Sequence, residues 1–157
     1  MVKIPNEAIT HAGRFHADDV FSAALLKILN PKINIVRRNV IPEGYQGLAF
    51  DLCDGEYDHH GDKAIFRDNG VQYASFGLLW KDYGCTLVSE KEAKAFDESF
   101  IQPLDFQDNN GGNNLLCRAI TQFNPKWDEE YADSDIAFFR AVEFAKYILE
   151  NEMKSMH

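Results

Sequence analysis

Short apolar segments alternate with a longer amphipathic segment in the first part of the sequence, and this alternation restricts the fold more than any other feature. From Val20 to Leu29 the apolar side chains recur at helical spacing, up to a prolyl turn. Strands that alternate with helices form parallel sheets, so we expect an α/β fold: a three-layer αβα domain with a mainly parallel sheet. The apolar segments short enough for strands are Ala8–Thr10, Ile33–Val36 and Leu48–Asp51.

The second half of the chain is predicted to be mostly helical. A capping box at Ser89–Glu92 marks the start of one helix, which Pro103 bends or restarts. The segment Asp105–Asn114 follows it. Further apolar stripes at helical spacing predict helices over Tyr73–Tyr83, Leu115–Phe123 and Ser134–Met153.

The charge balance and the cysteines exclude several classes of protein. With 16 Lys and Arg against 25 Asp and Glu, the formal net charge is −9, the wrong sign for holding a nucleic-acid backbone by the surface field alone. The 3 cysteines form no CxxC pair, so neither a disulfide framework nor a thiolate zinc site is expected. No apolar run is long enough to cross a bilayer, and we expect a cytoplasmic protein without a membrane partner.

Histidine and aspartate gather in three segments of the sequence. Four of the 5 histidines lie in THAGRFHADD and DLCDGEYDHHG, and LDFQDNNGG adds further carboxylates. The first two segments contain the ends of predicted strands, and the carboxyl ends of parallel strands form the crevice in which α/β proteins bind ligands. The candidate site residues are His11, His16 and Asp18 in the first segment, Asp51, Asp58, His59 and His60 in the second, and Asp105 and Asp108 in the third.

The donor types in these segments indicate metal binding. Imidazoles and carboxylates without thiolates suit Mn²⁺ best, and also Mg²⁺, Co²⁺, Fe²⁺ or Zn²⁺. About seven candidate ligands exceed what one ion takes from nitrogen and oxygen side chains, so we expect two divalent metal ions that share a bridging carboxylate. Two ions with a shared hydroxide nucleophile can clamp the charge that develops on a phosphoryl group, which predicts phosphoester hydrolysis.

Several of these residues also have a purely structural interpretation. Asp19 is interpreted only as a helix-capping residue, favoured by the helix dipole. Asp105 and Asp108 have the alternative of beginning a loop. Arg14 lies between two histidines and is therefore placed to reach a phosphate. Arg118 and Lys126 have the same ambiguity between a surface group and a phosphate contact, without that proximity to the histidines. Arg37, Arg38 and Arg67 are interpreted as solvated surface groups.

Taken together, the three segments resemble the metal motifs of the Asp-His-His (DHH) phosphoesterase superfamily and, within it, the melanocyte-proliferating-gene (Myg) family of exonuclease-like proteins. The resemblance continues through YASFGLLWKDYG, FNPKW and FFRAVEFAKYIL, over Ala8–Leu149. It implies a DHH phosphoesterase-like fold in which His11, His16 and Asp51 hold one ion. It also implies a second ion, held by Asp18, the bridging Asp51, His59 and Asp108.

By the same resemblance, His60 faces the substrate phosphate and donates a proton to the leaving oxygen, while Asp58 and Asp105 orient the metal ligands. The implied activity is that of a metal-dependent nuclease, 3′–5′ exonuclease-like, acting on short RNA or DNA or on a nucleotide-like phosphodiester. Proteins of this family usually carry a C-terminal substrate domain. We expect that domain to be absent here, with residues 1–157 forming a single DHH-like metal-binding catalytic domain.

Two other classes of function stay open as alternatives. One is a non-catalytic nucleotide- or protein-binding module that retains the DHH fold. The other is a single-metal hydrolase or deaminase-like enzyme with histidine and aspartate ligands, for which a metal count near one per chain would be expected. A homo-oligomer is compatible with the sequence in each case.

Overall fold

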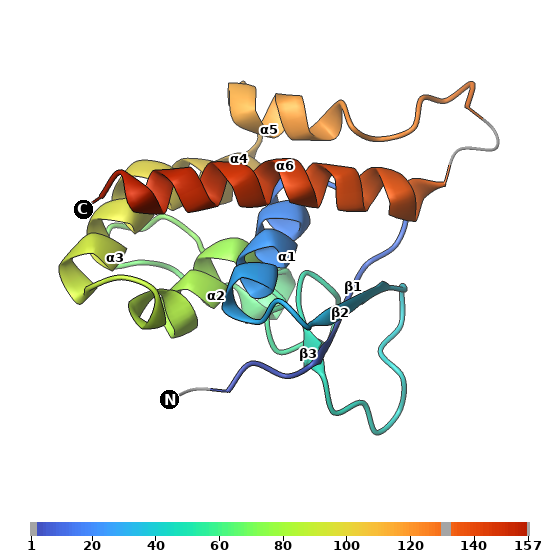
Figure 1. The fold of residues 1–157 in the computed structure, drawn as a ribbon, viewed down its shortest axis with the longest axis horizontal. Coiled ribbons are helices and arrows are strands. Elements are labelled where there is room, and N and C mark those ends of the chain that lie inside the picture. The colour runs from blue at the N-terminus through green and yellow to red at the C-terminus, as the bar shows by residue number, and fades with distance from the viewer. Residues whose placement is uncertain (1–2, 130–132, 157) are drawn as a thin grey trace.

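A parallel sheet and a group of helices beside it form the fold (Figure 1). The structure is a computed structural model, and it describes residues 3–129 and 133–156. The strands are β1 (Glu7–Thr10), β2 (Asn34–Arg37) and β3 (Leu48–Ala49). The helices are α1 (Ala17–Leu29), α2 (Ser75–Tyr83), α3 (Glu90–Phe96), α4 (Gln102–Asn110), α5 (Leu115–Thr121) and α6 (Ser134–Lys154).

The sheet has the strand order β2-β1-β3, and both strand pairs are parallel. Ala8 of the central strand β1 lies in register with Ile35 on one side and with Leu48 on the other. Because β1 and β3 run in the same direction, the residues that follow them, His11 and Asp51, leave the sheet at one edge. The α/β class, the parallel sheet and the helical second half are therefore confirmed.

Helix α1 is the most deeply buried of the described helices. All of its residues from Ala17 to Leu26 are buried, and Phe21 and Leu25 have no exposed surface. The helix packs against α6 and α2, and Figure 1 shows it between α6 and the sheet. Burial stabilises the fold by about 1.5–3 kcal/mol for each such side chain. The first turn of α1 is thus held firmly where the chain arrives from β1.

The chain around Pro103 is more helical than the sequence indicated. Ser89 caps α3 as expected, a π-helical turn over Asp97–Ile101 follows, and α4 begins beside Pro103, whose fixed φ suits a first helical turn. The helix continues to Asn110 and ends at Gly111, which has a φ of 76°. Asp105–Asn110 is therefore the end of a helix, and a loop beginning at Asp105 is excluded.

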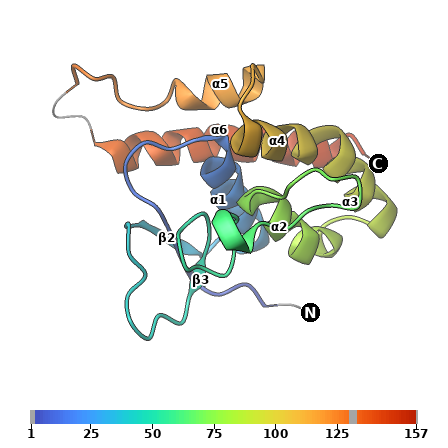
Figure 2. The same cartoon turned by 180° about the vertical axis from the view of Figure 1, so that it is seen from behind.

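The two faces of the sheet are covered differently. Side chains alternate between the faces of a strand, so Ala8 joins the large core with α1 while Ile9 points to the other side. There Ile9 packs with Ala49 and with Ile41 and Tyr45 of the loop before β3. Figure 2 shows α5 and α6 at the opposite end of the molecule from the sheet. Among the described residues, no helix is long and apolar enough to cross a membrane.

The prediction that Arg37 is a solvated surface group is wrong. Its side chain is buried, lies over the ring of Phe138 and forms an ion pair of 2.7 Å with Asp135 in the first turn of α6. It also donates to the carbonyl oxygen of Gly13. These partners compensate the burial of the Arg37 charge. Through them, Arg37 connects β2 with the loop before α1 and with α6.

Candidate metal centre

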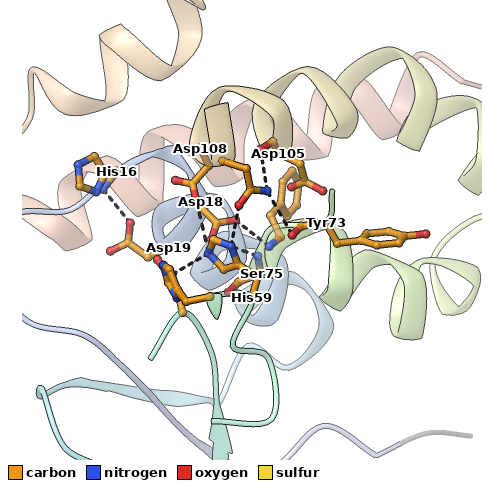
Figure 3. A network of polar contacts seen from close by, with 12 residues as sticks. His16, Asp18, Asp19, His59, Tyr73, Ser75, Asp105 and Asp108 are labelled. Carbon is orange, nitrogen blue, oxygen red and sulfur yellow. Dashed lines mark hydrogen bonds and ion pairs between the residues drawn. The ribbon is translucent and has the colours of Figure 1, made fainter. Parts of the chain in front are cut away.

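Three stretches of chain bring carboxylates and imidazoles to the carboxyl edge of the sheet. His11 follows β1, Asp18 and Asp19 lie in the first turn of α1, and Asp51 follows β3. Asp51 has a φ of 47°, in the left-handed region that few residues other than Gly adopt but that Asp tolerates. Figure 3 shows Asp18 and Asp108 beside His59, and Asp19 beside His16.

The first group of ligand atoms contains His11, Asp19 and Asp51. Nε2 of His11 lies 3.1 Å from Oδ2 of Asp19 and 3.3 Å from Oδ2 of Asp51. Asp19 is fully buried, and its Oδ1 accepts the backbone N–H of His16 at 2.8 Å. Its Oδ2 has no partner among the described residues apart from the His11 imidazole. Asp19 is thus a capping residue, as expected, and also a candidate ligand that the sequence did not indicate.

The second group contains Asp18, His59 and Asp108. Nε2 of His59 lies 3.4 Å from Oδ2 of Asp18 and 3.4 Å from Oδ2 of Asp108. The same nitrogen lies 3.2 Å from Oδ1 of Asp51. Asp51 therefore directs one oxygen toward His11 and the other toward His59. This is the arrangement that a carboxylate needs to bridge two cations.

Charge in the two groups is balanced by protons on the imidazoles. Burial opposes protonation of His11, but hydrogen bonds to Asp19 and Asp51 raise its pKa to about 11. Burial is likewise outweighed at His59, where Asp18 and Asp51 raise the pKa to about 11. Despite burial, hydrogen bonds from both histidines hold the pKa of Asp51 below its usual range. A divalent cation can take the place of these protons among the carboxylates.

Asp108 and Asp105, one turn apart on α4, have different surroundings. Burial, and then the nearby Asp18 and Asp51, raise the pKa of Asp108 to about 8, and its oxygen faces the second group. Asp105 instead forms a buried ion pair of 2.8 Å with Arg67 and accepts the backbone N–H of Gly77 at 3.3 Å. It belongs to no group of ligand atoms found among the described residues.

The prediction that Arg67 is a solvated surface group is also wrong. It is buried and contacts the carboxylates of both Asp97 and Asp105, at 2.6 and 2.8 Å, while its guanidinium lies 3.9 Å from the centre of the Tyr73 ring. Asp97 is in the π-helical turn and Asp105 is in α4. Arg67 therefore holds the helix that carries Asp108.

The DHH segment places its two histidines differently. His59 is buried, whereas the side chain of His60 is 57% exposed. Nδ1 of His60 lies 2.8 Å from Oδ1 of Asp58, whose carboxylate also accepts the backbone N–H of His60. Asp58 is buried and fixes the ring orientation of His60, a residue that lines the cleft. The imidazole of His60 also forms a third group of ligand atoms with Asp51 and His59.

Asp18 has two further contacts that hold the site against α2. Its carboxylate accepts the backbone N–H groups of Ser75 at 3.1 Å and Phe76 at 2.9 Å. A carboxylate at a helix N-terminus is stabilised by the helix dipole.

His16, expected as a ligand, is exposed and belongs to none of the three groups. It lines the neighbouring cleft.

A cleft of about 890 Å³ opens over the ligand groups. His11, Asp51, His60 and Asp108 line it, together with two exposed arginines, Arg14 from the loop before α1 and Arg118 from α5. No ion pair with a carboxylate is found for either arginine within residues 3–129 and 133–156. Both arginines are therefore accessible to an anionic ligand in the cleft. Arg14 and Arg118, both considered as phosphate contacts from the sequence, thus line the same cleft.

Fold and site together define an α/β protein with acidic and imidazole groups suited to cations at the carboxyl edge of a parallel sheet. The chain belongs to the MYG1 exonuclease family, described as an uncharacterised protein family (UPF0160), whose model matches residues 7–157. Placement in the DHH superfamily is consistent with this membership.

Curated relatives carry the same family name. The chain is 26% identical to MYG1 protein YER156C of Saccharomyces cerevisiae, over 90% of this chain and 54% of the relative. It is 25% identical to the MYG1 protein of Dictyostelium discoideum, with the same coverage of 90% and 54%. It is 22% identical to the MYG1 exonuclease of Mus musculus, over 87% and 47%. The chain thus spans about half the length of the curated relatives it matches. No solved structure matches it.

Proposed function

We propose that this chain is the metal-binding catalytic domain of a divalent-metal-dependent phosphoesterase, a nuclease that hydrolyses phosphodiester bonds. The observation that carries the proposal is the position of Asp51 between two imidazole and carboxylate groups. A buried carboxylate that directs its two oxygens to two such groups suits a pair of cations, and paired cations are typical of enzymes that cleave phosphoesters. Membership of a family with an exonuclease-named relative supports the same reaction class.

The residues at the site fit two divalent ions. Asp19 offers a buried carboxylate oxygen that, among residues 3–129 and 133–156, has no hydrogen-bond donor other than His11, and such an oxygen is available to coordinate a cation. The first ion would be held by His11, Asp19 and Asp51, with His16 as the ligand that the family resemblance adds. The second would be held by Asp18, Asp51, His59 and Asp108. Nitrogen and oxygen donors in this mixture favour Mn²⁺.

When bound, such ions activate water as a nucleophile and neutralise charge on the phosphate. The protein contributes the remaining steps through its own side chains. His60 donates a proton from Nε2 to the leaving oxygen, because Asp58 holds its Nδ1 and turns the ring toward the cleft. Asp105 acts indirectly by anchoring α4 through Arg67.

The substrate class follows from the charges around the cleft. The chain carries a net charge of −9, which disfavours long polynucleotides held by their backbone charge. Arg14 and Arg118 are placed to hold one or two phosphates close to the ligand groups. We therefore propose a short RNA or DNA end or a nucleotide-like phosphodiester as the substrate, with the 3′–5′ direction that the family resemblance implies.

Metal counting combined with an activity assay tests the proposal. The wild type and Asp51→Asn are loaded with Mn²⁺, analysed for metal content, and assayed on bis-p-nitrophenyl phosphate and on a short RNA. Asp62→Asn is the matched control, because Asp62 is exposed and lies outside the ligand groups. We expect about two ions per chain and activity in the wild type and control, with both reduced in Asp51→Asn. An intact fold that binds no metal and hydrolyses neither substrate would instead favour the non-catalytic binding module.

A further inference from the structure

Asn109, near the end of α4, reaches the side of His59 that faces away from the ligand groups. Its Oδ1 lies 3.0 Å from Nδ1 of His59, while Nε2 of the same ring faces Asp18 and Asp108. The two nitrogens of the imidazole are therefore in contact with different partners. Nothing in the spacing of the sequence links Asn109 to residue 59.

The orientation of the Asn109 amide is determined by three backbone carbonyl groups. Its Nδ2 lies 3.1 Å from the oxygen of Asp105, 3.3 Å from that of Tyr73 and 3.4 Å from that of Gln72. Carbonyl oxygens only accept hydrogen bonds, so the NH₂ group must face them. A flipped amide would place an oxygen against these three oxygens. The acceptor Oδ1 is therefore the atom that faces the imidazole.

An acceptor opposite Nδ1 requires a proton on Nδ1. In a neutral imidazole, Nε2 is then the nitrogen with the free lone pair, and Nε2 is the atom that faces Asp18, Asp51 and Asp108. We propose that Asn109 is a positioning residue that fixes His59 in the Nδ1–H tautomer and presents its Nε2 to a divalent cation. The inference rests on the proposed function, because it concerns the same metal site.

The surroundings make this contact difficult to replace. The side chain of His59 is only 2% exposed, so water has little access to Nδ1. Gln72 donates from its side chain to the backbone oxygen of His59 at 3.0 Å and so restrains the residue on another side. Asn109 directly follows Asp108 on α4, and one helix end therefore sets both a ligand and the ring orientation of its neighbour.

Zn²⁺ is the probe for the test, since it is diamagnetic and accepts nitrogen and oxygen ligands. Zn²⁺ affinity is measured by calorimetry, and the ring nitrogens of His59 are observed by ¹⁵N NMR in the loaded protein. The variant is Asn109→Leu, which keeps the size but removes the acceptor. Asn110→Leu is the matched control, because Asn110 is exposed and donates only to the helix carbonyl of Phe106.

We expect Zn²⁺ binding of Asn109→Leu to weaken by roughly ten- to a hundredfold, with the Nδ1–H signal of His59 lost or in rapid exchange. Asn110→Leu should bind as the wild type does. Asn109→Asp keeps an acceptor opposite Nδ1 and should retain the tautomer, although its carboxylate faces the carbonyls and lowers the melting temperature. Thermal unfolding without metal shows whether each variant is folded.

Two results would overturn the inference in distinguishable ways. If wild type and Asn109→Leu bind Zn²⁺ with the same affinity and show the same ¹⁵N pattern, the role of Asn109 is refuted while the metal site stands. If the folded wild type binds no metal, the proposed function fails and the inference fails with it. Should Asn109→Leu not fold, the ¹⁵N pattern of Asn109→Asp decides: a proton on Nε2 and a metal on Nδ1 would refute the tautomer.

Discussion

Replacement of Arg67 by Met should destabilise the protein strongly and in a pH-dependent manner. The Arg67 side chain is 5% exposed and is the buried cation between Asp97 and Asp105. Asp97 is 19% exposed and can be hydrated after the change, whereas Asp105 is 0% exposed and would keep an uncompensated charge. Breaking a buried pair by removing one partner costs about 3–5 kcal/mol.

Protonation of Asp105 limits this cost. Burial, followed by the nearby Asp18, already raises the pKa of Asp105 to about 8 in the folded protein, and Arg67 opposes that rise. Without Arg67 the folded-state pKa of Asp105 rises further. Wild type and variant both lose stability between the unfolded pKa, about 4, and about pH 8, and above about pH 8 the loss continues in the variant alone. We therefore expect a loss near the lower limit at neutral pH, about 3 kcal/mol. That loss corresponds to a fall in melting temperature of about 6–12 °C.

Urea unfolding of the metal-free proteins at pH 5, 7 and 9 measures this loss. The difference between wild type and Arg67→Met should be similar at pH 5 and 7 and widen at pH 9, because above about pH 8 only the variant still needs a proton on Asp105. Arg67→Met combined with Asp105→Leu should recover part of the stability, since no buried charge remains. A loss below about 1 kcal/mol, or a loss that is equal at all three pH values, would refute the interpretation of Arg67 as the compensating charge.

Three further predictions concern the site and its cleft. His60→Gln should retain its metal and fold but lose about 10²–10⁴-fold in kcat on bis-p-nitrophenyl phosphate, and unchanged kcat would exclude the proton-donor role. Arg118→Ala should raise KM more than it lowers kcat, with Arg140→Ala on α6, outside the cleft, as the control; equal effects of the two would exclude phosphate binding by Arg118. Mn²⁺ binding at pH 7 should release about three protons, and affinity should increase with pH. Two come from His11 and His59, whose pKa values are raised to about 11, and one comes from Asp108, whose pKa is raised to about 8. Calorimetry in buffers of different ionisation enthalpy measures that release, and its absence would contradict the charge balance of the metal-free site.

The sequence made the core of the site predictable because the relevant residues follow strands. His11 and Asp51 could be placed together from strand order alone, since parallel strands bring their carboxyl ends to one edge. The sequence could not distinguish a capping role of Asp19 from a ligand role, because the same carboxylate caps α1 with one oxygen and faces His11 with the other. One residue type in the first helical turn satisfies both functions, so the sequence pattern is the same for each.

Other parts of the structure depend on partners that are distant in the sequence. Arg67 meets Asp97 and Asp105, which lie 30 and 38 residues further along the chain. Arg37 meets Asp135, which lies 98 residues away. A single sequence contains no signal for such pairs, and a lone arginine is most simply assigned to the surface. The helix over Asp105–Asn110 could not be predicted for a different reason: asparagine and glycine, which are common in loops, also occur at this helix end.

The two sides of the metal centre differ in how firmly they are held, and this difference has a kinetic consequence. Asp18 and Asp19 belong to the first turn of the most deeply buried helix, whereas the Asp108 side chain is 20% exposed on the last full turn of α4. Opening on the α1 side requires disruption of the core, while opening on the α4 side requires fraying of a helix end and loss of the Asn109 hydrogen bonds. An ion held by Asp108 should therefore exchange with solvent rapidly, and an ion held by Asp19 should stay bound through many such exchanges.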